Sequence, residues 1–134
     1  MYLIDTSVWI ESLKKNSTFN IQKYFKEHEI FLCLPVYQEI LQGIRDDAIF
    51  WVVKKALDHS KFLEETLSKE TFEEATGIYR QARKKGITIR SSVDCLIAAI
   101  AIKNHATIVH KDRDYSEISK FTTLKEKNID LLFK

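Results

Sequence analysis

Five acidic side chains stand where a sheet-based fold would bring them together. Asp5 follows a short apolar run, Glu39 lies one turn into a predicted helix, and Asp94 opens an almost wholly apolar helix. Asp112 and Asp114 come just after another apolar run. Functional groups in open parallel sheets collect beyond the carboxyl ends of the strands, so we expect these acids to converge on one edge of the sheet.

Carboxylates gathered in one place indicate a bound cation. Their charges repel one another, and loss of hydration adds to the cost of holding them together. Ligand sets made only of oxygen favour Mg²⁺ or Mn²⁺ over zinc. Such ions activate water and stabilise the transition state of phosphodiester hydrolysis. The pattern therefore predicts a metal-dependent nuclease.

Each acid also has an ordinary structural interpretation. Asp5 is a candidate N-cap of the first helix, and Asp94 stands three residues after Ser91, which is the spacing of a capping box. Glu39 borders the apolar stripe of its helix, and Asp112 and Asp114 are suited to cap a short helix. Asp94 fits this interpretation least, because an unpaired charge among the apolar neighbours on its helix is costly. The acids are more informative together than singly.

The elements that would position these acids alternate along the chain. Strands are predicted at 2–4, 30–34, 107–109 and 129–133, with a short edge strand at 62–63; helices are predicted at 5–14, 19–28, 35–44, 47–58, 69–85, 93–104 and 114–121. Strands that alternate with helices are typical of a parallel sheet covered on both faces. We therefore predict an α/β fold, a three-layer α/β/α sandwich with a mostly parallel sheet.

The composition is that of an ordinary globular protein. The chain has 134 residues, of which 45% are hydrophobic and 30% charged, and we expect one domain over residues 1–134. No apolar run approaches the roughly 20 residues that cross a bilayer, so no membrane association is expected. Cys33 and Cys95 sit inside apolar segments rather than in a disulfide framework, which favours a reducing, cytoplasmic setting. With 21 basic and 19 acidic residues, the net charge identifies no partner.

Four segments of the chain, taken together, resemble one family. They are Leu3–Ile10, Glu39–Ile44, Ile87–Ala99 and His110–Tyr115. In order and spacing they are similar to the motifs of PIN-domain proteins, specifically the VapC-type toxins of type II toxin–antitoxin pairs in bacteria. The departures are mild: His110 stands where many relatives have Thr, and Tyr115 where many have Phe. The resemblance covers essentially the whole chain.

This resemblance implies a PIN-like fold and an activity. Proteins of this kind are Mg²⁺- or Mn²⁺-dependent endoribonucleases that cut structured RNA, often a tRNA or an rRNA loop. The resemblance also implies a cognate VapB-type antitoxin that occupies the active-site groove, and a homodimer. The RNA target and the antitoxin are not specified by these motifs.

The resemblance also assigns roles to the matching residues. Asp5 and Asp94 are expected to be the principal metal ligands, and the other acids to complete the site directly or through water. Thr6 and Ser7 are expected to support the site by hydrogen bonding. The predicted catalytic acids are Asp5, Glu39, Asp94 and Asp112, and the predicted metal ligands are these four together with Asp114.

A basic segment precedes the apolar helix that carries Asp94. Arg80, Arg83, Lys84, Lys85 and Arg90 place five cations in eleven residues with no acid between them. Binding of an RNA backbone is one interpretation, because Lys and Arg release counterions from nucleic acid. A solvated helix end, where cations complement the helix dipole, is the other. Arg90 is the strongest candidate for RNA contact because it lies four residues before the acid.

Two other classes of function compete with the nuclease. A non-catalytic PIN-like module that binds RNA or protein would keep the fold and use its acids for capping. A phosphoryl-transfer switch built on Asp5 would need a second aspartate two residues later, as in haloacid-dehalogenase-like sites, and Ser7 stands there. The acids of all four motifs, Asp5, Glu39, Asp94 and Asp112, are present. The sequence therefore favours the metal-dependent endoribonuclease.

Overall fold

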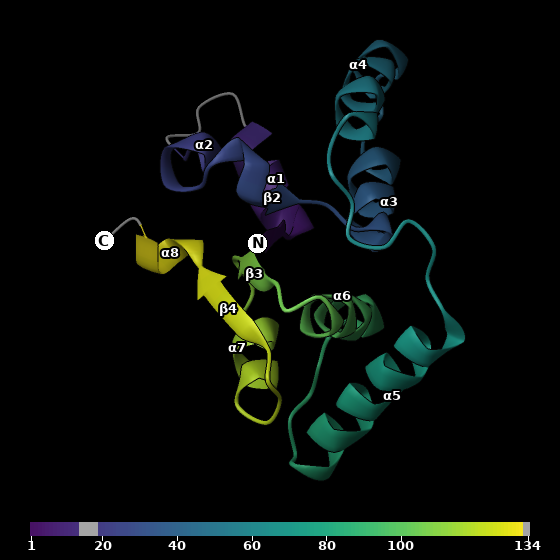
Figure 1. Cartoon of the computed structure of the whole chain (residues 1–134), viewed down its shortest axis with the longest axis vertical. Helices are drawn as coiled ribbons and strands as arrows, with labels where there is room; N and C mark the ends of the chain where they lie inside the picture. Colours follow the sequence, from purple (N-terminus) through teal and green to yellow (C-terminus); the bar gives the residue numbers. More distant parts are fainter. Residues whose placement is uncertain (14–18, 133–134) are drawn as a thin grey trace.

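The structure, a computed structural model, describes residues 1–13 and 19–132 (Figure 1). Its strands are β1 (Tyr2–Ile4), β2 (Ile30–Phe31), β3 (Thr107–His110) and β4 (Lys125–Asn128). Its helices are α1 (Thr6–Leu13), α2 (Ile21–Tyr24), α3 (Leu34–Gln42), α4 (Asp47–Asp58), α5 (Lys69–Lys84), α6 (Ser92–Lys103), α7 (Arg113–Ser119) and α8 (Ile129–Leu132), with a 3₁₀ turn η1 at Glu27–Glu29. No helix in the described ranges is long and apolar enough to span a membrane.

The sheet determines where the site can form. Its strand order is β2-β1-β3-β4, and every neighbouring pair is parallel. The chain leaves β1 toward β2 on one side, whereas it leaves β3 toward β4 on the other side. This reversal makes the carboxyl ends of β1 and β3 the switch point of the sheet, where an open α/β fold leaves room for a site.

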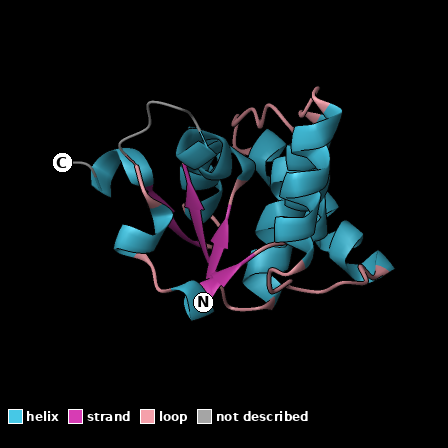
Figure 2. Ribbon diagram, turned by 90° about the horizontal axis from the view of Figure 1, so that it is seen from above, coloured by secondary structure: helices cyan, strands magenta, loops and turns pink. Residues whose placement is uncertain are grey.

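Helices cover both faces of this sheet, as Figure 2 shows. Successive strand residues point to opposite faces, so Leu3 and Ile108 pack into one core with α3, α5 and α6. Their neighbours Ile4 and Val109 pack into a second core with α1, α2 and α8. Both free cysteines are buried in the first core. The predicted α/β/α sandwich with a parallel sheet is confirmed.

Helix α5 illustrates how local sequence sets an element's limits. Ser68 caps its first turn, with the side chain accepting a hydrogen bond from the Thr71 N–H. At the other end Gly86 has φ +74, a left-handed conformation that glycine adopts without a Cβ penalty. The N–H of Ile87 then bonds the Ala82 carbonyl at 2.9 Å, which closes a Schellman motif. The predicted end of this helix before Gly86 is confirmed.

Three predicted elements are wrong, and one of them is the edge strand at 62–63, which is only an isolated bridge from Phe62 to Leu32. The last strand is Lys125–Asn128, and the predicted strand 129–133 begins instead as helix α8; Phe133 lies outside the described residues. The strand was missed because it is polar and lies at the edge of the sheet, with alternate residues exposed. The predicted helix over 19–28 is a single turn, α2, because Phe25 is extended where it enters the second core.

Candidate active site

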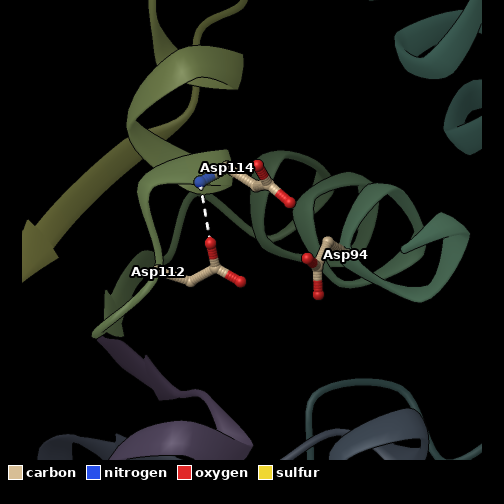
Figure 3. A group of neighbouring side chains, drawn as sticks. All are labelled: Asp94, Asp112 and Asp114. Atoms are coloured by element: carbon tan, nitrogen blue, oxygen red, sulfur yellow. Dashed lines mark hydrogen bonds between the residues drawn. The ribbon is translucent and has the colours of Figure 1, made fainter. Parts of the chain in front are cut away.

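Three aspartates form the centre of the site. Asp94 lies in the first turn of α6, Asp112 is the N-cap of α7, and Asp114 lies in the first turn of α7. Each offers one carboxylate oxygen to a set in which all atoms lie within 4.8 Å of one another. Figure 3 shows the three side chains pointing toward a common space between the two helix N-termini. We call these three residues the aspartate cluster.

Arg90 compensates part of this negative charge. Its guanidinium donates to Asp112 Oδ1 at 2.8 Å, and its Nε lies 3.5 Å from Asp114 Oδ2. The backbone N–H of Arg90 also donates to Asp114 Oδ2, at 3.1 Å. Asp114 is 1% exposed, so these bonds matter because a buried carboxylate is costly without partners. Arg90 was predicted as an RNA contact, and the structure places it on the cluster itself.

Tyr115 connects Asp5 to the aspartate cluster. Its side chain is fully buried, and its hydroxyl donates toward Asp5 Oδ1 at 2.9 Å and Asp94 Oδ1 at 3.3 Å. Asp5 follows β1 and is itself buried. Sequence reasoning gave Tyr115 no role. The signal that could have found it was the hydroxyl at a position where many similar proteins have Phe.

Ser7 holds the other oxygen of Asp5. Its hydroxyl donates to Asp5 Oδ2 at 2.7 Å, and its backbone N–H donates to the same oxygen at 3.3 Å. The Lys111 N–H donates in turn to Ser7 Oγ at 3.3 Å. Asp5 therefore caps the start of α1, as its ordinary interpretation held, while its second oxygen faces Tyr115. Capping of α1 and a place in the acidic site are therefore compatible roles for Asp5.

Glu39 lies on a separate side of the site. It belongs to α3 and accepts a hydrogen bond from Thr6 Oγ1 at 3.0 Å. Burial raises the pKa of this carboxyl, and the negative charge of Asp5 raises it further, against the opposing effect of the Thr6 bond. Glu39 therefore interacts electrostatically with Asp5, whereas the compact set of oxygens comes from the three aspartates.

The surroundings of Asp94 disfavour the charged form of its carboxyl group. Burial raises its pKa to about 7, and the charges of Asp5, Asp112 and Asp114 contribute further, while the Tyr115 bond opposes the shift. The capping alternative for Asp94 does not describe this geometry, because the Ser91 side chain bonds the Val93 N–H. The ionised side chain meets other negative charges instead.

A divalent cation would relieve this repulsion, and the residues fit one. The donors are carboxylate oxygens, which hard ions such as Mg²⁺ and Mn²⁺ prefer. They come from two helix N-termini that fix their positions, and Arg90 compensates the cluster from one side. The donor set favours a hard divalent ion over zinc.

His110 stabilises the loop that carries Asp112. The ring is fully buried, with Nε2 2.6 Å from Glu126 on β4. Its Nδ1 accepts a hydrogen bond from the Asp112 N–H at 3.0 Å. Because Nδ1 accepts, the ring proton lies on Nε2 and points to the glutamate. His110 thus holds a structural position, behind the aspartate cluster.

The predicted basic segment divides between two sides of α5. Arg83 lies over the Tyr79 ring, with 5.2 Å between guanidinium carbon and ring centroid, on the side that faces Arg90 and the start of α6. Lys84 lies on the opposite flank of the helix. Lys85 is the exposed C-cap of the helix.

Fold and site together define a class. An α/β protein with a parallel sheet and with carboxylates after β1 and on α3, α6 and α7 around its switch point has the oxygen ligands that a hard cation could bind. The family model described as PIN domain matches residues 2–121. The chain belongs to the PIN domain family.

Curated relatives cover nearly the whole chain. It is 37% identical over 130 residues to VapC ribonuclease Mb1587 of Mycobacterium bovis, an alignment that spans 93% of this chain and 96% of that protein. The same values hold for ribonuclease VapC11 of Mycobacterium tuberculosis.

Solved structures share the fold at lower identity. DNA-bound VapBC from Salmonella typhimurium matches with a TM-score of 0.75 at 15% identity, over 95% of this chain and 96% of that one. VapBC2 from Rickettsia felis, bound to a promoter DNA fragment, matches with a TM-score of 0.72 at 19% identity, over 95% and 97%.

Proposed function

We propose that this protein is a metal-dependent endoribonuclease and the toxin of a type II toxin–antitoxin pair. The observation that carries the proposal is the aspartate cluster at the switch point of a PIN-domain sheet. The 37% identity to proteins named VapC ribonuclease supports RNA as the substrate. By analogy with the family, the substrate is structured RNA, a tRNA or an rRNA.

The acids would hold Mg²⁺ or Mn²⁺. Asp94, Asp112 and Asp114 supply the compact oxygen set, and Asp5 joins it through the Tyr115 hydroxyl. When bound, such an ion supplies Lewis-acid stabilisation of the phosphoryl oxygens and activation of water. Glu39 remains a proposed contributor from the α3 side, at longer range.

The remaining groups orient the acids and receive the substrate. Arg90 fixes two carboxylates through its ion pairs and is exposed enough to meet a phosphate. Ser7 and Thr6 hold Asp5 and Glu39 in their orientations. The chain therefore contributes pre-organised negative charge for a cation, flanked by positive charge for the RNA backbone.

Cleavage of total cellular RNA by purified protein tests the proposal. We expect discrete fragments with Mg²⁺ or Mn²⁺ and none with chelator. Asp5→Asn should remove the fragments, whereas Asp47→Asn, which changes an exposed aspartate on α4, should leave them. If folded protein free of antitoxin cuts nothing under any metal condition, the proposal fails and a non-catalytic binding module takes its place.

We propose two protein partners for the chain, a VapB-type antitoxin and a second copy of itself. Several structural neighbours are VapBC toxin–antitoxin complexes, which supports the antitoxin. For the homodimer, α4 carries the exposed apolar residues Ile49, Trp51 and Val52, whose relative exposures are 55%, 64% and 71%. Figure 1 shows α4 at one end of the long axis, where a second copy has access. The buried free thiols support a cytoplasmic setting.

The dimer has its own test. Sedimentation of the purified protein should give twice the monomer mass, and Val52→Lys should shift it to the monomer mass without lowering the melting temperature. Lys125→Ala, a change of an exposed lysine on β4, is the control outside α4. A monomeric wild type would remove α4 as a dimer surface and leave the ribonuclease proposal standing.

A further inference from the structure

A groove runs between α5 and the start of α6 and leads to the aspartate cluster. Its volume is about 720 Å³, and Phe72, Tyr79, Arg83, Arg90 and Val93 are among the residues that line it. We call it the α5–α6 groove. Figure 1 shows the two helices side by side. Because the Arg90 that lines the groove also pairs with two acids of the cluster, the groove adjoins the site.

Charge in the groove is of one sign. Arg80, Arg83 and Arg90 line it, and no acidic side chain is among its described lining residues. Arginine is always protonated, and its planar fork matches the oxygens of a phosphate. The opposite flank of α5 is mixed, because Glu74 lines it together with Arg80 and Lys84. Of the two flanks, the one that adjoins the acids is therefore the more complementary to a polyanion.

Aromatic surface accompanies this charge. Phe72 is 49% exposed although it is large and apolar, and its ring borders the groove. Tyr79 lies beneath Arg83 and restrains that guanidinium through a cation–π contact of 5.2 Å. A positively charged groove with an exposed aromatic ring is the arrangement that binds single-stranded nucleic acid, because any unpaired base offers a face for stacking.

We propose that the α5–α6 groove binds unpaired RNA nucleotides that adjoin the cleaved phosphodiester bond. Arg80 and Arg83 contact the backbone phosphates, and Phe72 stacks on a base. Double-stranded RNA does not fit this role, because its bases are stacked on one another and offer no free face. The proposal rests on the proposed function and deepens it, since it restricts the substrate to RNA that is single-stranded or looped beside the cut.

Binding of a short fluorescein-labelled oligoadenylate, measured by anisotropy, tests the groove. The protein carries Asp94→Asn in every sample, so that the RNA stays intact. Adding Phe72→Ala should weaken binding by about tenfold through loss of one stacked base, and Arg83→Ala should weaken it by a similar factor through loss of a phosphate contact. Arg83→Ala should also lower the slope of log affinity against log salt by about 1. A duplex RNA of equal length should bind more weakly than the single strand.

Two control variants make this result specific. Lys84→Ala removes a cation from the same helix on the other flank, and Arg45→Ala removes an exposed arginine after α3. We expect less than a twofold change for each. If Lys84→Ala weakens binding as much as Arg83→Ala, the effect is general charge and the groove proposal is wrong. Unchanged melting temperatures exclude unfolding for these exposed positions.

The groove and the proposed function fail separately. For this comparison Asp94 is restored, so that cleavage can be measured. If the wild type cuts RNA and both Arg83→Ala and Phe72→Ala keep its KM, the groove proposal alone is wrong. Failure of wild type to cut RNA overturns the ribonuclease. An acidic peptide is the competing occupant: if the groove variants lose affinity for an oligoglutamate peptide and keep it for RNA, the groove is a protein-binding surface.

Discussion

The two sides of the acidic site are built differently. On one side, Asp94, Asp112 and Asp114 share a common space, with Arg90 and Tyr115 as bonding partners. On the other, Glu39 projects from α3 toward Asp5 and is held by Thr6. Negative charge is therefore concentrated where helix N-termini and an arginine compensate it. The α3 carboxylate stands outside that compensation.

The largest effect on RNA cleavage should come from substitution of Asp94 in the aspartate cluster. Asp94→Asn keeps the shape and removes a donor, so RNA cleavage should fall by more than the roughly 100-fold upper range for partners outside the metal's own ligands. Cleavage of a mapped RNA at saturating Mg²⁺ measures the loss. Asp47→Asn serves as the control. Near-wild-type cleavage by Asp94→Asn would place the catalytic acids elsewhere.

Glu39→Gln should reduce RNA cleavage less than Asp94→Asn does. Because Glu39 is not within the compact oxygen set, we expect a loss of about 10- to 100-fold, the range for groups that act on a metal through others. Mn²⁺ binding without RNA, followed by calorimetry, should change less than in Asp94→Asn. Equal losses of metal affinity in the two variants would show that the two sides form one ligand set.

Tyr115→Phe tests the link between Asp5 and the cluster. Phenylalanine fills the same buried space and lacks the hydroxyl that donates to both carboxylates, so Mn²⁺ affinity should fall by about tenfold while the melting temperature stays near that of wild type. Tyr24→Phe, on the exposed side of α2, is the matched control. A strong loss of stability with unchanged metal affinity would assign the hydroxyl a purely structural role.

The smallest expected effect is that of Asp94→Asn on the stability of the metal-free protein. This effect is a gain, whereas the effects on cleavage and metal affinity are losses. The pKa of Asp94 is raised from 3.8 to about 7 in the folded protein, so between these values the fold holds a proton that the unfolded chain releases. The free energy of unfolding of metal-free protein therefore falls as pH rises across that window.

Asp94→Asn removes this pH-dependent loss of stability, because asparagine does not ionise. With chelator at pH 8, the variant should be more stable than wild type by about 1 kcal/mol, a value reduced for the partial exposure of the carboxyl. The difference should vanish near pH 4, as urea unfolding at the two pH values would reveal. Equal stability at pH 8 would mean that the repulsion in the cluster is relieved without a cation.

Much of the sheet was predictable because its central strands are apolar. Ile4 and Val109 lie in runs that the pattern identifies, and their flanking caps fix the helices that follow. The edge strand β4 was not predictable, because Lys125–Asn128 has no apolar pattern and is held by pairing to β3. Its position depends on a partner far away in the sequence.

The site was predictable as a set of acids and less so as a geometry. The rule for parallel sheets placed Asp5 and Asp112 at the same edge, where both are found. The division that leaves Glu39 apart depends on how α3 packs. The bridge from Tyr115 depends on two carboxylates, 110 and 21 residues away in the sequence. Hydrogen bonds of that range leave no local pattern in the sequence.

The burial of the two cysteines gives the molecule an internal reporter of its own opening. Burial raises the pKa of the Cys33 thiol to about 12 and that of Cys95 to about 11, so neither forms the reactive thiolate at neutral pH. Alkylating reagents and mild oxidants reach these thiols when the first core opens. The rate of thiol labelling under native conditions therefore reports how often the protein exposes its interior.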